Sequence, residues 1–533
     1  MFRKMDSQRR LDEGHLWMPA VCRQRLEETW PHIFRKQVLG MIPEEEFSGL
    51  YSLDQGRPNF PVAILVSLSI LKEMLDLTDE ALMDSFRFDM RFHYALGLTL
   101  DDTDLTIRTL YNFRARVIGS EAVGAVFATV TDRIIAILHL DVSLQRMDST
   151  HIRSNMATLT RLGLFTRTME HFMGRLSKDF PSRFVELPEE IRKRYGERNG
   201  RFGDAKSSEG RRRLDVAAAD LWFLVQRFRD DAAVSMMPEF KLLERLLDEQ
   251  CRVGGGDEGG PPVVALKEGK EIAADSLQSP FDPNASYDGH KGVGYQVQIS
   301  ETCASGNPIQ LITRVEVEPA HLSDQHALLP ALDDLEKREI APERMFADTA
   351  YNSGDNLIAA VKRGVDLVAP TPGKADPDGI GLGHFELDLV ALKVCGCPQG
   401  EGPIRDRLGS DDQTHNLLFD LERCCVCELA LDCPAGKAGG RLRVHPRDVA
   451  TAFNRAREES EPFKKDYAIR AGIESTNAEC KTAHGLGKVW NREESGVTFS
   501  ATMKTLACNA KRFMRYQCAQ FRENAAEMAP SPA

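Results

Sequence analysis

Residues 60–118 carry apolar side chains at helical spacing, interrupted by short polar breaks. The run PVAILVSLSILKEML predicts a helix that begins near Pro61, because proline is favoured at a first helical position. Thr78 is suited to cap a second helix, DEALMDSFRF, and a third is expected from Thr103 onwards. We therefore expect an N-terminal helical domain over residues 1–120. Three short helices with tight turns fit a helix-turn-helix DNA-binding unit and a plain helical bundle equally well.

Strand patterns dominate after residue 140. The segment VSLQRMD predicts a short strand that ends at Asp148, and two longer strands are expected from Tyr295 and Ile309. A strand ending at Asp348, a helix and a further strand then predict a parallel βαβ unit, which is the building block of an α/β sheet. The fold class predicted is therefore α/β.

The remaining segments predict how this α/β core is divided. Its first part is expected at 140–370, its last part at 441–520, and a Cys-rich insertion at 371–440. Within the first part, residues 155–250 predict a charged helical insertion, and the run GGGDEGGPP at 254–262 predicts a flexible break.

Composition narrows the class of protein further. Apolar content of 42% and charged content of 28% are typical of a soluble globular protein, and no apolar run reaches the length of a membrane span. The first residues contain no apolar signal segment, so we expect a cytoplasmic protein. Net charge is −12, yet residues 434–533 hold 17 Lys and Arg against 11 Asp and Glu. This basic end permits a phosphate-binding surface there.

Four polar residues near the C-terminus follow the spacing Y-x2-R-x3-E-x6-K: Tyr467, Arg470, Glu474 and Lys481. On a helix that turns about 100° per residue, all four side chains fall within a stripe about 60° wide. A carboxylate flanked by Arg, Lys and a phenol can hold a metal ion and bind phosphate at one place. The alternative is a solvated helix face with ordinary charge pairs.

Two isolated aspartates upstream favour the metal-binding interpretation of that helix face. Asp148 and Asp348 each follow a predicted strand, and ligands of open α/β sheets lie at the carboxyl ends of strands. Either residue alone is more typical of a turn or helix cap. Together with Glu474 they form an acidic set suited to Mg²⁺ or Mn²⁺, and two such ions can drive a phosphodiester displacement. Arg470 and Lys481 would then hold the DNA backbone, and Tyr467 would stack on a base or bond to phosphate.

Six of the twelve cysteines lie between Cys395 and Cys433. Such clustering in a cytoplasmic chain indicates metal binding more than disulfides. Four thiolates make a closed structural Zn²⁺ site, and the ligands predicted are Cys397, Cys424, Cys427 and Cys433. The alternative is a set of buried thiols without metal.

His290 and Lys291 precede the strand at Tyr295 within YDGHKGVGYQVQ. The glycines of this segment indicate a close approach of backbone or ligand. A hairpin edge is one interpretation. A role of these basic residues in DNA binding or in support of the metal site is the other, and Lys291 is the DNA contact expected.

At this point the residues resemble a known family, the DDE transposases of bacterial insertion sequences. The resemblance is carried by MDSTHIRSNMA around Asp148, DPNASYDGHKGVGYQVQ, FADTAYNSGDNL around Asp348, and YAIRAGIESTNAECK. The Y-R-E-K spacing marks the IS-four superfamily, and within it the chain is similar to the IS eleven-eighty-two group. RPNFPVAILVSLSILKEML resembles that family's N-terminal helical domain.

The resemblance implies an RNase H-like fold and Mg²⁺-dependent cleavage at insertion-sequence ends, followed by transfer of the freed 3′-hydroxyl into target DNA. By it, Asp148, Asp348 and Glu474 are the catalytic acids, and the Cys-rich segment is a zinc-ribbon-like insertion. Partners expected are terminal inverted repeats and target DNA, with a homodimer or higher oligomer as the active complex and nucleoid association when DNA is bound. Two alternatives stay open: a nuclease of this fold that does not join strands, and a domesticated DNA-binding protein. A sugar hydrolase is disfavoured because none of the four Trp adjoins the acids.

Overall fold

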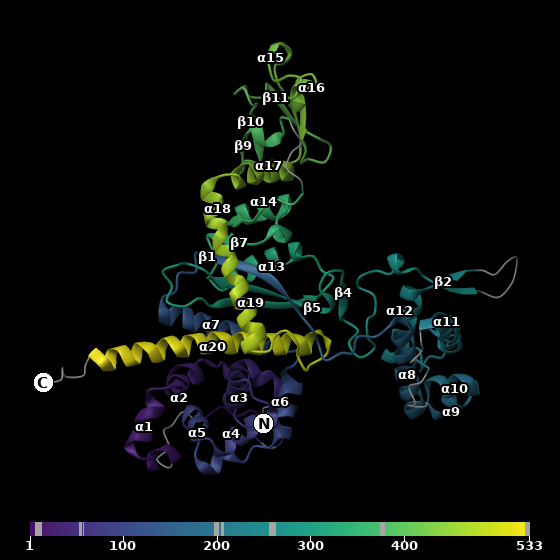
Figure 1. The fold of residues 1–533 in the computed structure, drawn as a ribbon, viewed down its shortest axis with the longest axis vertical. Helices are drawn as coiled ribbons and strands as arrows, with labels where there is room; N and C mark the ends of the chain where they lie inside the picture. The colour runs from purple at the N-terminus through teal and green to yellow at the C-terminus, as the bar shows by residue number, and fades with distance from the viewer. Residues whose placement is uncertain are drawn as a thin grey trace.

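The chain folds as a mixed α/β protein with a central sheet (Figure 1). N-terminal helices lie below the sheet in this view, a helical extension projects to the right, and a narrow arm rises at the top. The predicted glycine-rich break, apart from Gly254, lies outside the described residues. The computed structural model describes residues 1–5, 13–52, 56, 58–196, 202–203, 207–254, 263–373 and 379–527.

The central sheet has the order β6-β5-β1-β7-β8, with the short β4 also pairing with β5. β5 runs antiparallel to β1 and β6, whereas β7 and β8 run parallel to β1. The strands are β1 (Leu144–Ile152), β4 (Ser286–Asp288), β5 (Gly292–Thr302), β6 (Ile312–Pro319), β7 (Arg344–Phe346) and β8 (Asp366–Val368). The predicted α/β class and the βαβ unit are therefore confirmed.

The register of β1 and β7 brings two distant parts of the chain together. Arg146 of β1 pairs with Phe346 of β7 in parallel orientation. Asp148 lies two residues after Arg146 and Asp348 two residues after Phe346, so the two aspartates lie on adjacent segments. The prediction that the first strand ends at Asp148 is wrong: β1 continues to Ile152, because Ser149 to Ile152 pair with β5. Asp148 is thus a mid-strand residue, whereas Asp348 follows β7 and caps the next helical turn.

The helices predicted between residues 60 and 118 are present. Thr78 caps the second of them by accepting a hydrogen bond from the amide of Ala81. The structure adds helices that the pattern missed. The helices of the described N-terminal residues up to 118 are η1 (Gly14–Trp17), α1 (Ala20–Glu27), α2 (Trp30–Ile33), η2 (Phe34–Val38), η3 (Leu39–Met41), η4 (Glu44–Leu50), α3 (Val62–Leu75), α4 (Asp79–Phe88), α5 (Met90–Leu96), η5 (Leu100–Thr103) and α6 (Ile107–Val117).

One apolar core joins these N-terminal helices to the sheet. α3 is buried along most of its length and packs against the long C-terminal helix α20 (Glu493–Glu527), which also packs on β6 (Figure 1). Further helices around the sheet are α7 (Ala122–Leu138), η8 (Asp324–His326), α13 (Leu328–Lys337), η9 (Thr349–Tyr351), α14 (Gly354–Lys362) and α17 (Pro446–Glu458). N-terminal helices and sheet are therefore held as one packed body.

The Y-R-E-K residues were predicted to lie on one regular α-helix, but the helix that carries them is interrupted. It consists of α18 (Glu461–Tyr467), a 3₁₀ turn η11 (Ala468–Ala471) and α19 (Gly472–Ala483). The interruption has a physical cause. The guanidinium of Arg146 donates to the carbonyl of Ile469 and lies so close to Gly472 that a Cβ there would clash with it.

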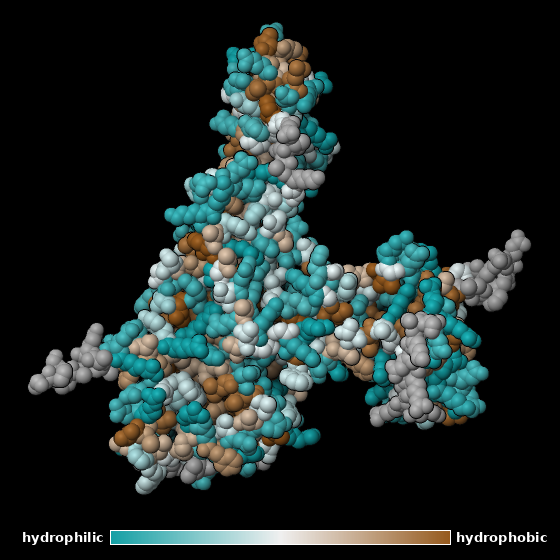
Figure 2. Space-filling view, viewed as in Figure 1, coloured by the Kyte–Doolittle hydropathy of each residue, from teal (hydrophilic) through white to brown (hydrophobic). Residues whose placement is uncertain are grey.

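Two extensions leave the sheet. The helical one has its own apolar core and contains α8 (Arg161–Asp179), α9 (Pro181–Val185), α10 (Glu189–Tyr195), α11 (Ser207–Phe228), α12 (Pro238–Gln250), β2 (Cys251–Gly254), β3 (Val263–Leu266) and η7 (Gly269–Glu271). The Cys-rich arm contains η10 (Leu382–His384), β9 (Glu386–Asp388), β10 (Lys393–Gly396), β11 (Arg405–Leu408), β12 (His415–Leu418), α15 (Leu421–Val426), α16 (Pro434–Lys437) and β13 (Arg441–Val444). Figure 2 shows apolar surface near the end of this arm, where Val426 and Leu431 are exposed.

In the described part of the chain, no helix has the length and apolar character needed to cross a membrane.

Candidate active site

Three carboxylates from three separate segments meet at one guanidinium. The Nη2 atom of Arg470 lies 3.0 Å from Oδ1 of Asp148 and 3.9 Å from Oδ2 of Asp348. Its Nη1 atom lies 3.1 Å from Oε1 of Glu474. Residues 126 and more positions apart in the sequence therefore share one small volume at the face of the sheet covered by α19.

Asp148 is the most enclosed of the three acids, with 13% of its side chain exposed. Arg470 holds one carboxylate oxygen, and the amide nitrogen of Asn477 donates to the other at 3.0 Å. Burial raises the pKa of Asp148, Arg470 opposes that effect, and the nearby charge of Asp348 adds to it. A buried acid beside a second acid is a common feature of functional sites.

Asp348 and Glu474 are more open to solvent. Asp348 caps η9 by accepting from the amide of Ala350 at 2.8 Å, so the turn-residue interpretation of this aspartate also holds. Beneath it, the buried Tyr351 donates a hydrogen bond to Gln298 of β5, which anchors the loop to the sheet. Glu474 stands in the first turn of α19 and is 66% exposed. One enclosed acid and two open ones thus face a common space.

The other residues of the Y-R-E-K spacing lie around these acids. Tyr467 stacks on Phe463, with ring centroids 6.0 Å apart, and burial raises its pKa. Lys481 lies on α19, and burial and the neighbouring charge of Lys291 lower its pKa. The ammonium of Lys291 donates to Ser149, the residue after Asp148, at 3.2 Å. The structure therefore places Arg470 at the centre of the acidic cluster and brings Tyr467, Lys481 and Lys291 to its edge.

Sequence reasoning missed three residues that support this cluster. Glu301 is fully buried, and its carboxylate contacts both Arg146 and Arg512. Arg146 also donates to the carbonyl of Ile469, which fixes the backbone next to Arg470. Asn477 had a detectable signal, because three residues after Glu474 it shares that residue's helix face. Glu301 and Arg146 had none, since each looks like an ordinary strand residue.

The donor set of the cluster fits a hard divalent cation. Carboxylate oxygens are the ligands that Mg²⁺ and Mn²⁺ prefer, and Asp148, Asp348 and Glu474 supply them around one space. Arg470 balances part of their charge.

The cysteine side chains of the arm also gather. Cys397, Cys424 and Cys427 line a pocket of about 410 Å³, and Cys433, the residue before α16, belongs to the apolar cluster against which Cys397 and Cys424 pack. Burial raises the pKa of Cys424, and the three other thiols contribute to that shift. Four thiols fit the donor chemistry of zinc, although no three of their sulfurs, all in described segments, form a group within 4.8 Å of one another. The zinc site stays a prediction.

The zinc content of purified protein tests whether the Cys-rich arm binds this metal. Cys427→Ser removes one thiolate, so the purified full-length protein is expected to lose one equivalent of zinc, since three remaining thiolates cannot close a tetrahedral site. Exposed Cys22 provides the matched control, because Cys22→Ser leaves the arm intact. Elemental analysis is the measurement. Equal zinc content in the two variants would remove the arm from consideration as a metal site.

Comparison with known proteins finds two domain families in this chain. Residues 24–116 match a family described as a transposase domain (DUF772). Residues 396–514 match a family described as a transposase DDE domain, and this span includes Tyr467, Arg470, Glu474 and Lys481. No curated protein and no solved structure was matched. The two matched domains, of which the second is a transposase DDE domain, indicate a transposase function for this chain.

Proposed function

We propose that this protein cleaves DNA at the ends of an insertion sequence and joins the freed 3′-hydroxyl to target DNA, with Asp148, Asp348 and Glu474 as catalytic acids. The observation that carries the proposal is the contact of all three carboxylates with Arg470. Acids so arranged, beside basic residues, suit phosphodiester chemistry better than a solvated charge pattern.

The strand order supports an RNase H-like core for this enzyme. Its middle strand, β1, pairs antiparallel with β5 on one side and parallel with β7 on the other, and β6 and β8 form the two outer strands. Asp148 on β1 and Asp348 after β7 are adjacent because these strands are parallel and in register. The Y-R-E-K spacing supports the proposal that the chain belongs to the IS-four superfamily, and the segments around the acids support a place within its IS eleven-eighty-two group.

Each residue of the site has a distinct part in the proposed chemistry. Asp148, Asp348 and Glu474 would hold Mg²⁺ or Mn²⁺, which when bound activates the attacking oxygen and stabilises the departing one. Asn477 keeps the Asp148 carboxylate oriented toward the site. Arg470 lies close enough to pair with a scissile phosphate, because its guanidinium already occupies the centre of the acidic cluster.

Lys481 and Lys291 are proposed to bind the DNA backbone beside the acids. Burial, and after it the charge of Lys291, lowers the pKa of Lys481, and a phosphate placed beside both lysines would relieve their repulsion. Lys481→Gln is therefore expected to weaken DNA binding and to reduce the salt dependence of the binding constant by about one ion. Lys178→Gln, an exposed change on α8, is the matched control. Identical salt slopes for both variants, measured by fluorescence anisotropy, would remove Lys481 from the DNA interface.

Strand transfer separates a transposase from a nuclease of the same fold. The substrate is a duplex of the element's own terminal repeat, read from the DNA that flanks the gene and nicked beforehand to expose the 3′-hydroxyl. Wild-type protein with Mg²⁺ is expected to join this end to a target plasmid, and a 3′-deoxy end is expected not to join. Cleavage of an intact end without any joining would favour the nuclease instead.

A further inference from the structure

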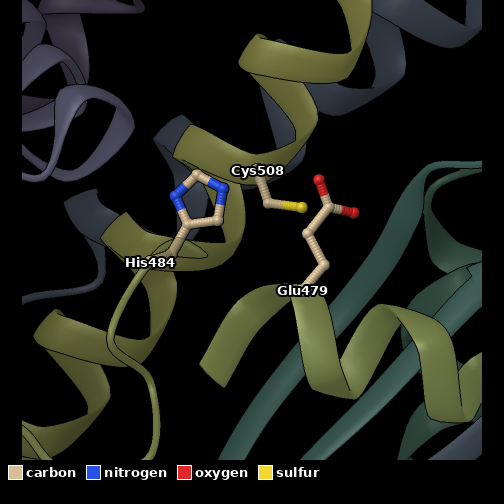
Figure 3. Close-up of side chains that lie close together, drawn as sticks. All are labelled: Glu479, His484 and Cys508. Carbon is tan, nitrogen blue, oxygen red and sulfur yellow. The ribbon is translucent and has the colours of Figure 1, made fainter. Parts of the chain in front are cut away.

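A second cluster of metal-binding side chains lies where α19 ends and α20 passes over it (Figure 3). Glu479 comes from α19, His484 from the turn that follows, and Cys508 from α20. Their ligand atoms all lie within 4.8 Å of one another, and His484 and Cys508 are fully buried. The proposed catalytic acids are not part of this group.

One ring nitrogen of His484 makes a hydrogen bond, and the other makes none. Nδ1 lies 3.0 Å from the carbonyl oxygen of Glu73, and a carbonyl only accepts, so Nδ1 carries the proton. In the neutral ring Nε2 therefore bears a lone pair. This atom is buried and has no hydrogen-bond partner, and Figure 3 shows it on the side of the ring that faces Cys508. Metal-binding histidines typically have this arrangement, with the second ring nitrogen donating to a carbonyl.

The carboxylate of Glu479 is likewise held from one side. Both hydrogen bonds from Arg512 go to Oε2, at 3.0 and 2.7 Å, and the sulfur of Cys508 points toward the carboxylate (Figure 3). A fourth side chain, Cys480, is buried and within hydrogen-bonding reach of Cys508. Nitrogen, sulfur and oxygen donors thus converge, and a buried, unpartnered nitrogen lone pair is costly unless a ligand meets it.

We propose that Glu479, His484 and Cys508 form a structural zinc site, with Cys480 as the fourth ligand. Zinc is favoured over Mg²⁺ because thiolate and imidazole are its preferred ligands, whereas Mg²⁺ prefers oxygen. Binding displaces the thiol protons to solvent. The ion ties α19, which carries Glu474, to α20, and through His484 and Glu73 to α3 of the N-terminal helices.

Cobalt binding to the full-length protein tests this site. The chelator-stripped protein is titrated with Co²⁺, whose thiolate charge-transfer absorption reports sulfur ligands, and Zn²⁺ is then added to displace it. All variants carry Cys427→Ser, so that the thiols of the Cys-rich arm contribute as little as possible to the cobalt absorption. In this background the protein is expected to bind one Co²⁺ with thiolate absorption, and addition of Cys508→Ser is expected to remove that absorption.

The matched control is Cys518→Ser, a change on the same helix ten residues further on. It is expected to keep the absorption and the affinity. Cobalt spectra that are identical with and without Cys508→Ser, in protein shown to be folded by circular dichroism, would overturn the proposal and leave a buried thiol and imidazole that bind no metal. If Cys508→Ser does not fold, Glu479→Gln is the variant to test. Loss of this one ligand is expected to weaken Zn²⁺ binding about tenfold or more. Unchanged Zn²⁺ binding would overturn the proposal.

Discussion

Replacement of Asp148 by Asn is expected to abolish metal-dependent DNA cleavage while DNA binding persists. Asn keeps the size of the side chain but removes the charge that holds a cation between Asp148, Asp348 and Glu474. We expect a loss of at least about a thousandfold in cleavage rate, equivalent to ~4 kcal/mol of barrier. Asp348→Asn and Glu474→Gln are expected to behave alike. Cleavage of a labelled terminal-repeat duplex gives the rate, and a gel-shift assay gives the binding.

Asp355→Asn supplies the control for these variants. Asp355 is an exposed aspartate in the first turn of α14, close in sequence to Asp348 but outside the acidic cluster. It is expected to cleave at the wild-type rate. Near-normal cleavage by any one of the three cluster variants would exclude that residue from catalysis.

Loss of Arg146 is expected to have the largest effect on stability. Its guanidinium contacts Glu301 at 2.7 Å, and Glu301 is fully buried, so Arg146→Met leaves a buried carboxylate with Arg512 as its remaining charged partner. Breaking a buried ion pair costs about 3–5 kcal/mol of unfolding free energy. Because Arg146 also bonds to the carbonyl of Ile469, the folded fraction is expected to cleave DNA more slowly. Equilibrium urea unfolding measures the first effect.

Arg133→Met is the comparison for Arg146→Met. Arg133 is exposed and donates a hydrogen bond to the carbonyl of Gly40, away from the buried network of Arg146, Glu301 and Arg512. Its loss is expected to cost about 0.5 kcal/mol or less. If Arg146→Met costs no more than this, the buried network does not support the site as described.

The convergence of the Y-R-E-K residues was predictable because helical spacing alone places them on one face. The prediction survives the 3₁₀ turn, since η11 and α19 continue in line below α18 (Figure 1). The turn itself was not predictable. It depends on Arg146, more than 300 residues earlier in the chain, which occupies the space beside Gly472.

The extent of β1 shows how a local pattern can mislead. The polar run after Met147, including Asp148 and Ser149, resembles a turn, yet it stays in the sheet because β5 offers a full row of backbone partners. The contacts of Glu301 were equally hidden. Its partners Arg146 and Arg512 are 155 and 211 residues away, and only the folded topology brings them together.

The most direct test of the central claim is a change of metal preference. Cysteine at a ligand position favours Mn²⁺ over the harder Mg²⁺, because thiolate is a softer ligand than carboxylate. Asp148→Cys, Asp348→Cys and Glu474→Cys are therefore expected to lose cleavage of the terminal-repeat duplex in Mg²⁺ and to regain part of it in Mn²⁺, whereas Asp355→Cys cleaves normally in both. If any of the three cysteine variants cleaves at the wild-type rate in Mg²⁺, that side chain does not hold the ion, and the three-acid site is contradicted.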